Sequence, residues 1–226
     1  MTAASPDPLV LFGGTFDPVH FGHLRVAADV RTALAVPRVM LVPAADPAHR
    51  PPPGAPAADR VAMLELAIDG DACIGLELAE IRRGGTSYTV DTLRELRAQW
   101  PARPLAWVVG ADAFLGLPTW HQWRMVLTLA HLIVVARPGV VLSESLHGEL
   151  AELWNARATT DLGALRHPAG AILRVHTSPN AISATAIRAA LAQQPRDDAA
   201  LIRLLPQAVL TYIESHQLYG AAADAR

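Results

Sequence analysis

The chain has 226 residues, of which 51% are hydrophobic, and a formal net charge of −2, so we expect one large domain with a sizeable core. Because it has no basic cluster and no apolar run long enough to cross a bilayer, we expect neither nucleic acid nor a membrane among its partners. The single Cys73 cannot form an internal disulfide, and residues 1–8 do not resemble a signal peptide, so we expect a cytoplasmic protein.

Strand-like apolar runs alternate with helical patterns along the chain. We expect strands at residues 9–12, 38–42, 74–78, 105–109 and 131–136, with a further one at 171–175. This alternation predicts an α/β fold: a Rossmann-like open parallel sheet with helices on both faces and a small helical C-terminal portion. If the strand order is 3-2-1-4-5, the first and fourth strands flank the point where such sheets bind ligands.

Three segments outside these strands have distinct patterns. Residues 43–56 form a long, proline-rich, irregular loop, which is typical of a functional segment. Asp59 is expected to be the N-cap of the helix that follows it, and residues 143–160 are expected to include a surface helix. We expect a single domain over residues 1–226, with about 183–219 as a helical C-terminal subdomain.

The stretch Gly13-Gly14-Thr15-Phe16-Asp17-Pro18-Val19-His20-Phe21-Gly22-His23 joins the first strand to a helical pattern. We expect the glycine pair to end the strand and let the backbone turn tightly. Backbone N–H groups and the positive end of the helix dipole would then meet where a phosphate can bind. His20 and His23 can donate to phosphate oxygens; the alternative is a turn in which both histidines only cap and pack.

A second motif, Ile182-Ser183-Ala184-Thr185-Ala186-Ile187-Arg188, lies far along the chain. Together the two motifs resemble the signatures of the nucleotidyltransferase superfamily related to class I aminoacyl-tRNA synthetases, whose members carry His-x-Gly-His after the first strand. Within that superfamily the chain is similar to the bacterial nicotinate-mononucleotide adenylyltransferases from Leu9 to Tyr219. The shared segments are Gly13–Leu24, Pro43 through His49-Arg50, Ser87–Thr89 with Thr92-Leu93, Gly110-x-Asp112, Pro118–Trp120, Arg137–Gly139, Ile182–Arg188 and Leu210–Tyr219.

This resemblance implies transfer of the adenylyl group of ATP to nicotinate mononucleotide, giving deamido-NAD and pyrophosphate, with Mg²⁺ accompanying ATP. It implies catalytic roles for His20, His23 and Arg188, and no metal site built from protein ligands. The residues expected to bind ATP are Gly13, Gly14, Thr15, Phe16, His20, His23, Ser183, Thr185 and Arg188. Those expected to bind the mononucleotide are His49, Thr89, Asp112, Trp120 and His121.

The residues expected to bind the acceptor are predicted for different reasons. An indole can stack on a pyridine ring, and the resemblance selects Trp120 over Trp107 and Trp123 for this role. The resemblance also implies that Thr89, with the backbone around His121, holds the pyridine carboxylate. Asp112 follows the fourth strand, where it can accept hydrogen bonds from ribose hydroxyls or serve as a helix N-cap.

Two alternatives to this function stay open. The first motif does not separate this activity from that of another superfamily member, such as a phosphopantetheine adenylyltransferase or a cytidylyltransferase, although segments 87–89 and 118–120 favour a pyridine acceptor. A non-catalytic nucleotide-sensing module is the other alternative, against which the intact histidine pair argues. The sequence leaves open the exact roles of Asp17, Arg50 and Arg137, and it is compatible with a homo-oligomer.

Overall fold

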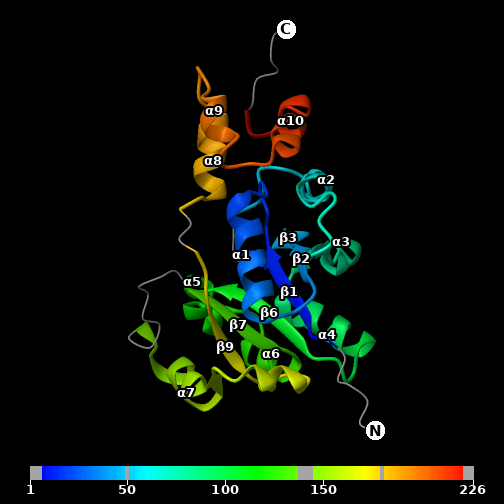
Figure 1. The fold of residues 1–226 in the computed structure, drawn as a ribbon, viewed down its shortest axis with the longest axis vertical. Helices are drawn as coiled ribbons and strands as arrows, with labels where there is room; N and C mark the ends of the chain where they lie inside the picture. Colours follow the sequence, from blue (N-terminus) through cyan, green and yellow to red (C-terminus); the bar gives the residue numbers. More distant parts are fainter. Residues whose placement is uncertain (1–6, 49–50, 137–144, 179–180, 221–226) are drawn as a thin grey trace.

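The computed structural model describes residues 7–48, 51–136, 145–178 and 181–220. Its central element is a parallel seven-stranded sheet in the order β4-β2-β1-β6-β7-β9-β8 (Figure 1). The bounds of these strands are Ile74–Leu76 for β4, Val39–Pro43 for β2, Leu9–Gly14 for β1, Leu105–Gly110 for β6, His131–Ala136 for β7, Ile172–His176 for β9 and Ala158–Thr159 for β8. A separate pair, β3 (Asp46–Pro47) and β5 (Thr86–Ser87), is also parallel.

This topology confirms the predicted Rossmann-like fold and strand order. Strands β1 and β6 are paired at the centre of the sheet, with Leu9 opposite Leu105, so their carboxyl ends form the expected ligand-binding edge. Strand β8 was not predicted, because two residues give no periodic signal. The loop at 43–56 was expected to be irregular, but it contains β3.

Alternate residues along the central strands point to opposite faces of the sheet, as a parallel sheet covered on both sides requires. Val10, Val108 and Ile133 belong to one hydrophobic cluster, whereas Leu11 and Val134 belong to the other. The first cluster includes residues of α1, α2, α8, α9 and α10, and the second includes residues of α4, α5, α6 and α7. The helix bounds are Phe21–Ala33 (α1), Ala57–Ala67 (α2), Ala79–Arg83 (α3), Thr89–Gln99 (α4), Ala111–Leu115 (α5), Trp123–Leu129 (α6), Gly148–Arg157 (α7), Ala184–Leu191 (α8), Asp198–Leu201 (α9) and Gln207–Ser215 (α10).

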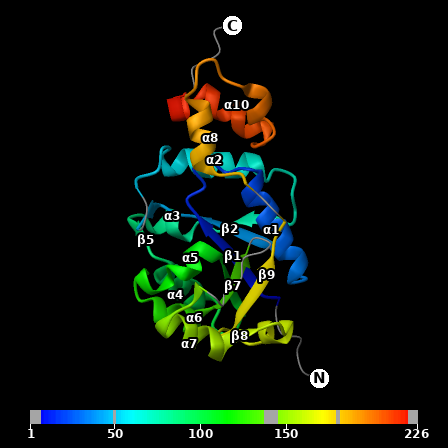
Figure 2. The ribbon, with the colours of Figure 1, turned by 90° about the vertical axis from the view of Figure 1, so that its left-hand side faces the viewer.

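The C-terminal helices lie at one end of the molecule, beside α2 (Figures 1 and 2). Val209 and Ile213 of α10 are fully buried in the same hydrophobic cluster as Met63 of α2. The Tyr212 hydroxyl also donates a hydrogen bond of 2.8 Å to Asp59 Oδ1. These helices therefore share the core of the sheet domain.

One predicted helix boundary is wrong. Helix α2 begins at Ala57 with Pro56 as its N-cap, so Asp59 lies within the first turn. Its carboxylate instead accepts the hydrogen bond from Tyr212. The expected surface helix is α7, which starts at Gly148. No helix among the described residues is long and apolar enough to cross a membrane.

Candidate active site

Gly13 and Gly14 are the last two residues of β1, so the prediction that they make a tight turn is wrong. Their role is to let aromatic rings approach the backbone. A Cβ at Gly13 would lie 2.3 Å from the Trp107 ring, and one at Gly14 would lie 3.0 Å from the Phe16 ring. The residue of this motif that adopts a left-handed backbone conformation is Phe16, with φ of 51°. The chain thus leaves the strand without side chains that would displace these rings.

The two histidines of the first motif form a stacked pair. Their ring centroids are 3.7 Å apart and the ring planes are inclined by 22°. The Phe16 ring contacts His23 edge-on at 5.0 Å. His20 is the N-cap residue of α1, and its side chain makes no capping hydrogen bond. Of the alternative in which both histidines only cap and pack, the capping part is therefore not supported for His20, whereas the packing part agrees with the stacked pair.

His20 is held in an environment that disfavours its charged form. Only 5% of the residue is exposed, and within the described part of the chain its Nδ1 atom has no hydrogen-bond partner. Burial lowers the pKa of His20 to about 4, opposed by a backbone hydrogen bond. At neutral pH the free protein therefore presents a neutral imidazole with an unused nitrogen.

The start of α1 offers fewer backbone donors than the sequence suggested. The Phe21 N–H donates to the Leu204 carbonyl oxygen at 2.9 Å, and the His23 N–H donates to the His20 carbonyl oxygen at 2.9 Å. The first of these bonds ties the C-terminal helices to the helix start. We conclude that side chains supply more of the donors at this point than the sequence analysis expected.

The second motif meets the first at Asp17. Arg188 Nη1 donates to the Asp17 carbonyl oxygen at 2.7 Å and lies 3.5 Å from Asp17 Oδ2. Its side chain keeps 34% exposure, so part of the guanidinium faces solvent. The Ser183 hydroxyl oxygen caps α8 by accepting the Ala186 N–H at 3.2 Å, and Thr185 Oγ1 lies 3.5 Å from Arg188 Nη2. The fold brings Arg188 to Asp17, in the segment that follows β1. The Ser183 side chain is engaged in capping α8.

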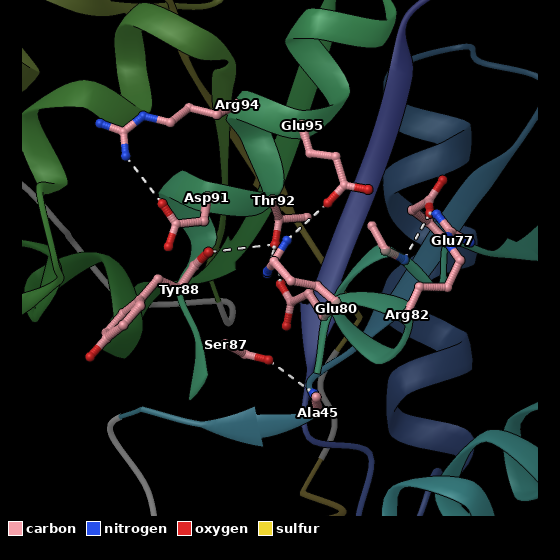
Figure 3. Close-up of polar contacts among 12 residues, drawn as sticks. Ala45, Glu77, Glu80, Arg82, Ser87, Tyr88, Asp91, Thr92, Arg94 and Glu95 are labelled. Carbon is pink, nitrogen blue, oxygen red and sulfur yellow. Dashed lines mark hydrogen bonds and ion pairs between the residues drawn. The ribbon is translucent and has the colours of Figure 1, made fainter. Parts of the chain in front are cut away.

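Two of the predicted acceptor segments lie side by side. The Tyr88 ring lies 4.6 Å from the His121 ring, which brings segment 87–89 beside segment 118–121. Thr89 is the first residue of α4 and is half-buried. Figure 3 shows Tyr88 projecting away from the buried polar contacts around Thr92. The structure therefore brings the segment that contains Thr89 beside His121, and their roles at the pyridine carboxylate stay a prediction.

The choice among the tryptophans agrees with the burial of each. Trp107 lies in β6 with 3% exposure and Trp123 has 8%, so both are core residues. Trp120 is half-buried, so part of the residue remains accessible. Asp112 is exposed in the first turn of α5, directly after β6, and Gly110 is the N-cap. The N-cap alternative for Asp112 is thus wrong, and its carboxylate remains accessible.

Three residues singled out in the sequence lie outside the described residues: His49, Arg50 and Arg137. The positions predicted for the first two, between β3 and α2, therefore remain sequence-based expectations.

Comparison with known proteins adds independent evidence. A family model described as cytidylyltransferase-like matches residues 11–190. The chain is 46% identical over 217 residues to a probable nicotinate-nucleotide adenylyltransferase of Stenotrophomonas maltophilia, covering 93% of this chain and 96% of that protein. A relative of the same name from Acidithiobacillus ferrooxidans is 45% identical over 222 residues, covering 97% and 99%. The chain belongs to the cytidylyltransferase-like family, among its nicotinate-nucleotide adenylyltransferases.

Solved structures agree on the fold. The Plasmodium falciparum nicotinic acid mononucleotide adenylyltransferase complexed with NaAD superposes with a TM-score of 0.73. The comparison covers 96% of this chain and 100% of that one at 15% identity. At that identity the likeness supports the shared architecture of these adenylyltransferases and no residue role.

The sequence analysis of this adenylyltransferase did not resolve the part played by Asp17. The residue is 5% exposed, and its carboxylate accepts hydrogen bonds from the Gly54 N–H at 2.7 Å, the Ala55 N–H at 3.0 Å and the Tyr219 hydroxyl at 2.8 Å. Burial, followed by the bond to Asp17, raises the pKa of Tyr219. Asp17 therefore joins the first motif, the loop before α2 and the C-terminal segment.

The sequence analysis of this enzyme missed Arg60 entirely. Arg60 is fully buried and donates to the carbonyl oxygens of Thr15 at 2.7 Å, Ala45 at 3.0 Å and Ala55 at 3.2 Å. Burial lowers its pKa, whereas the neighbouring Asp17 charge raises it. The available signal was spacing: Arg60 shares the helical face of Met63 and Leu64, where an arginine is unusual.

The carboxylate of the first motif, Asp17, is hydrogen-bonded to protein groups. Among the described residues, no group of three or more His, Cys, Asp or Glu side chains could hold a metal ion. Asp17, the buried carboxylate of the first motif, is occupied by the two N–H groups and the Tyr219 hydroxyl. The donors around this motif thus suit an anion better than a bare cation.

Proposed function

We infer that this enzyme transfers the adenylyl group of ATP to nicotinate mononucleotide, forming deamido-NAD and releasing pyrophosphate in NAD biosynthesis. The names of its closely similar relatives support this reaction. The observation that carries the site assignment is the meeting of the two motifs, where Arg188 contacts Asp17 across 171 positions of sequence. That contact puts a cation and the His20–His23 pair at one end of β1.

The reaction joins two anions, so charge has to be neutralised and the reactants aligned. A phosphate oxygen of the mononucleotide attacks the α-phosphorus of ATP, a new P–O bond forms, and the bond to the pyrophosphate oxygen breaks. No protein nucleophile is needed. His20 and His23 would donate hydrogen bonds to the triphosphate, and Arg188 would offset charge on the leaving pyrophosphate. Gly13, Gly14, Thr15 and Phe16 would line the ATP site, with Ser183 and Thr185 at the start of α8.

His20 can respond to the triphosphate because its imidazole is neutral in the free protein. A nearby anion favours the protonated form, so ATP binding should raise the low pKa of this side chain. The donor is therefore strengthened when the substrate arrives. Its stacking on His23 fixes the orientation of both rings.

The acceptor side would select the pyridine. Trp120 would stack on the ring, and Thr89 with the backbone at His121 would bind the carboxylate. Asp112 would accept hydrogen bonds from ribose hydroxyls, and His49 would contact the acceptor phosphate. The contact between Tyr88 and His121 supports this grouping, because it brings the two segments together.

Mg²⁺ would enter with ATP as part of the substrate. The engaged state of the Asp17 carboxylate supports this view, since phosphate oxygens and water would then provide most of the ligands. The ion would offset charge on the triphosphate. From the lone Cys73 we also propose that the enzyme works in the reducing cytoplasm.

Pyrophosphate release with ATP tests the function. The acceptors should be nicotinate mononucleotide, nicotinamide mononucleotide and phosphopantetheine, each with and without Mg²⁺. We expect Mg²⁺-dependent turnover that is fastest with nicotinate mononucleotide. Fastest turnover with phosphopantetheine would assign a different family activity, and binding of nucleotides without turnover would identify a sensing module.

A further inference from the structure

The backbone of Ala45 is held from both sides. Its N–H donates to Ser87 Oγ at 2.9 Å, and its carbonyl oxygen accepts from Arg60 Nη2 at 3.0 Å. Ala45 directly precedes β3, which pairs with the strand containing Ser87. The backbone of Ala45 thus connects Ser87, in the segment that precedes Thr89, to the buried Arg60.

On one side, Arg60 connects Ala45 to Thr15, in the segment after β1 that is proposed to bind ATP. Its Nη1 atom donates to the Thr15 carbonyl oxygen at 2.7 Å, and its Nε donates to the Ala55 carbonyl oxygen at 3.2 Å. Ala55 in turn donates its N–H to Asp17, whose carbonyl oxygen is bonded to Arg188. The guanidinium therefore fixes the backbone on which the proposed ATP-binding side chains depend.

On the other side, Ser87 is hydrogen-bonded to the buried Glu80 carboxylate, and Figure 3 draws the hydrogen bond between Ser87 and Ala45. Glu80 is 4% exposed and accepts a hydrogen bond of 2.8 Å from the Thr92 hydroxyl. Burial raises the pKa of Glu80, while hydrogen bonds from Thr92 and Ser87 and the charge of Arg83 lower it. Arg83 Nη2 also lies 2.9 Å from Thr92 Oγ1. These contacts hold Ser87 in place next to Tyr88 and Thr89.

We propose that Ser87 and Arg60 are positioning residues that hold the Ala45 backbone on its two sides and couple the segment after β1 to the acceptor segment 87–89. Neither residue is assigned a substrate contact. The inference rests on the proposed function, because it assigns the two coupled regions to the two substrates. Its distinctive consequence is that a change at Ser87, on the acceptor side, affects the binding of ATP.

The variants Ser87→Ala and Arg60→Lys test this coupling. Ser87→Ala removes the acceptor of the Ala45 N–H, and we expect KM to rise on the order of tenfold for both substrates, with a smaller change in kcat. Ser87→Thr keeps a hydroxyl and should restore most of the loss. Arg60→Lys keeps the charge, but a single ammonium cannot reach three carbonyl oxygens on separate segments. We expect it to raise KM for ATP more than KM for the mononucleotide.

The double variant decides whether the two residues both act through Ala45. If they do, the rise in KM for ATP in Ser87→Ala/Arg60→Lys is smaller than the product of the two single rises. A rise in KM confined to the mononucleotide in Ser87→Ala, or a double effect equal to that product, would overturn the proposal. Ser215→Ala is the matched control, since the hydroxyl of Ser215 bonds to Tyr212 and His216 in the α10 region, and the change should alter neither KM.

Equilibrium binding separates this inference from the proposed function. A non-hydrolysable ATP analogue is titrated by calorimetry into the wild-type chain and Ser87→Ala, with circular dichroism as the test of folding. Weaker analogue binding by folded Ser87→Ala supports the coupling even if the acceptor proves to be another molecule. Equal binding overturns the coupling even if wild-type turnover with nicotinate mononucleotide is fast.

Discussion

The two halves of the proposed site are built differently. On the ATP side, two buried groups bonded to several segments lie behind the proposed ATP-binding side chains: Asp17 is 5% exposed and Arg60 is fully buried, whereas Arg188 keeps 34% exposure. On the acceptor side, Asp112 and His121 are exposed, and Trp120 and Thr89 are half-buried. Transition-state charge has to meet donors that are already in place, whereas an acceptor can be chosen by side chains at the surface. The difference suggests that the rigid half performs the chemistry and the open half selects the substrate.

The largest expected effect concerns the histidine pair. We expect His20→Ala and His23→Ala each to lower kcat on the order of a hundredfold, because each removes one preorganised donor, worth roughly 3 kcal/mol of transition-state stabilisation. Steady-state pyrophosphate release measures it. His147→Ala is the control, since this exposed residue precedes α7 and makes no side-chain cap hydrogen bond. Near-normal turnover in either folded histidine variant would remove that residue from the catalytic group.

The stability of the two halves should respond differently to loss of a carboxylate. Asp17→Asn replaces an oxygen that accepts buried N–H and hydroxyl donors, so we expect the free energy of unfolding to fall by about 2–3 kcal/mol. Asp112→Asn changes an exposed residue and should cost less than about 0.5 kcal/mol. Urea denaturation of both variants makes the comparison. Equal losses would contradict the contrast between a buried half and an open one.

The acid sensitivity of folding sharpens the same contrast. The pKa of His20 lies at about 4 in the folded protein, below the ordinary value of 6.5, so unfolding takes up a proton between these values. His20 therefore favours folding fully above pH 6.5, and this contribution is lost as pH falls toward 4. Between pH 7.5 and pH 5 we expect a loss of about 2 kcal/mol from this group. In His20→Ala the fall in unfolding free energy over that range should be smaller by this amount, and an unchanged fall would contradict the burial argument.

The smallest expected effect lies on the acceptor side. Trp120→Ala removes a stacking surface, and we expect KM for the mononucleotide to rise about three- to tenfold while KM for ATP stays constant. Both nicotinate and nicotinamide mononucleotides should be affected alike, because their rings are similar in size. A rise confined to ATP would place Trp120 on the other side of the site.

The sequence predicted the parts of this architecture that depend on periodic patterns. The strand at 131–136 matches β7, and the central position of β1 follows from the alternation of strands and helices. Both motifs were found because their residue types and order are specific. The pattern could not show why Gly13 and Gly14 are glycines, since the reason is contact with the Trp107 and Phe16 rings.

The residues missed by the sequence act through long-range backbone contacts. Arg60 donates to backbone carbonyl oxygens at three places in the chain. Every residue type has a backbone carbonyl, so the sequence does not show which residues accept these hydrogen bonds. Tyr219 reaches Asp17 across 202 positions, which local spacing cannot reveal. The prediction of Asp59 as an N-cap was wrong because helix α2 begins three residues earlier than expected, after Pro56. The Asp59 carboxylate instead accepts a hydrogen bond from Tyr212, which is distant in sequence.

The division between a chemical half and a selective half is tested most directly by the preference for the acid over the amide acceptor. We would measure kcat/KM for nicotinate and nicotinamide mononucleotides in the wild-type enzyme, His20→Ala and Thr89→Val. The account predicts that His20→Ala lowers both values by the same factor and keeps their ratio. Thr89→Val should mainly reduce the value for the acid and so shrink the ratio, because a hydroxyl donor that the bound substrate covers is worth about 1–3 kcal/mol. A changed ratio in His20→Ala, or an unchanged ratio in Thr89→Val, would contradict it.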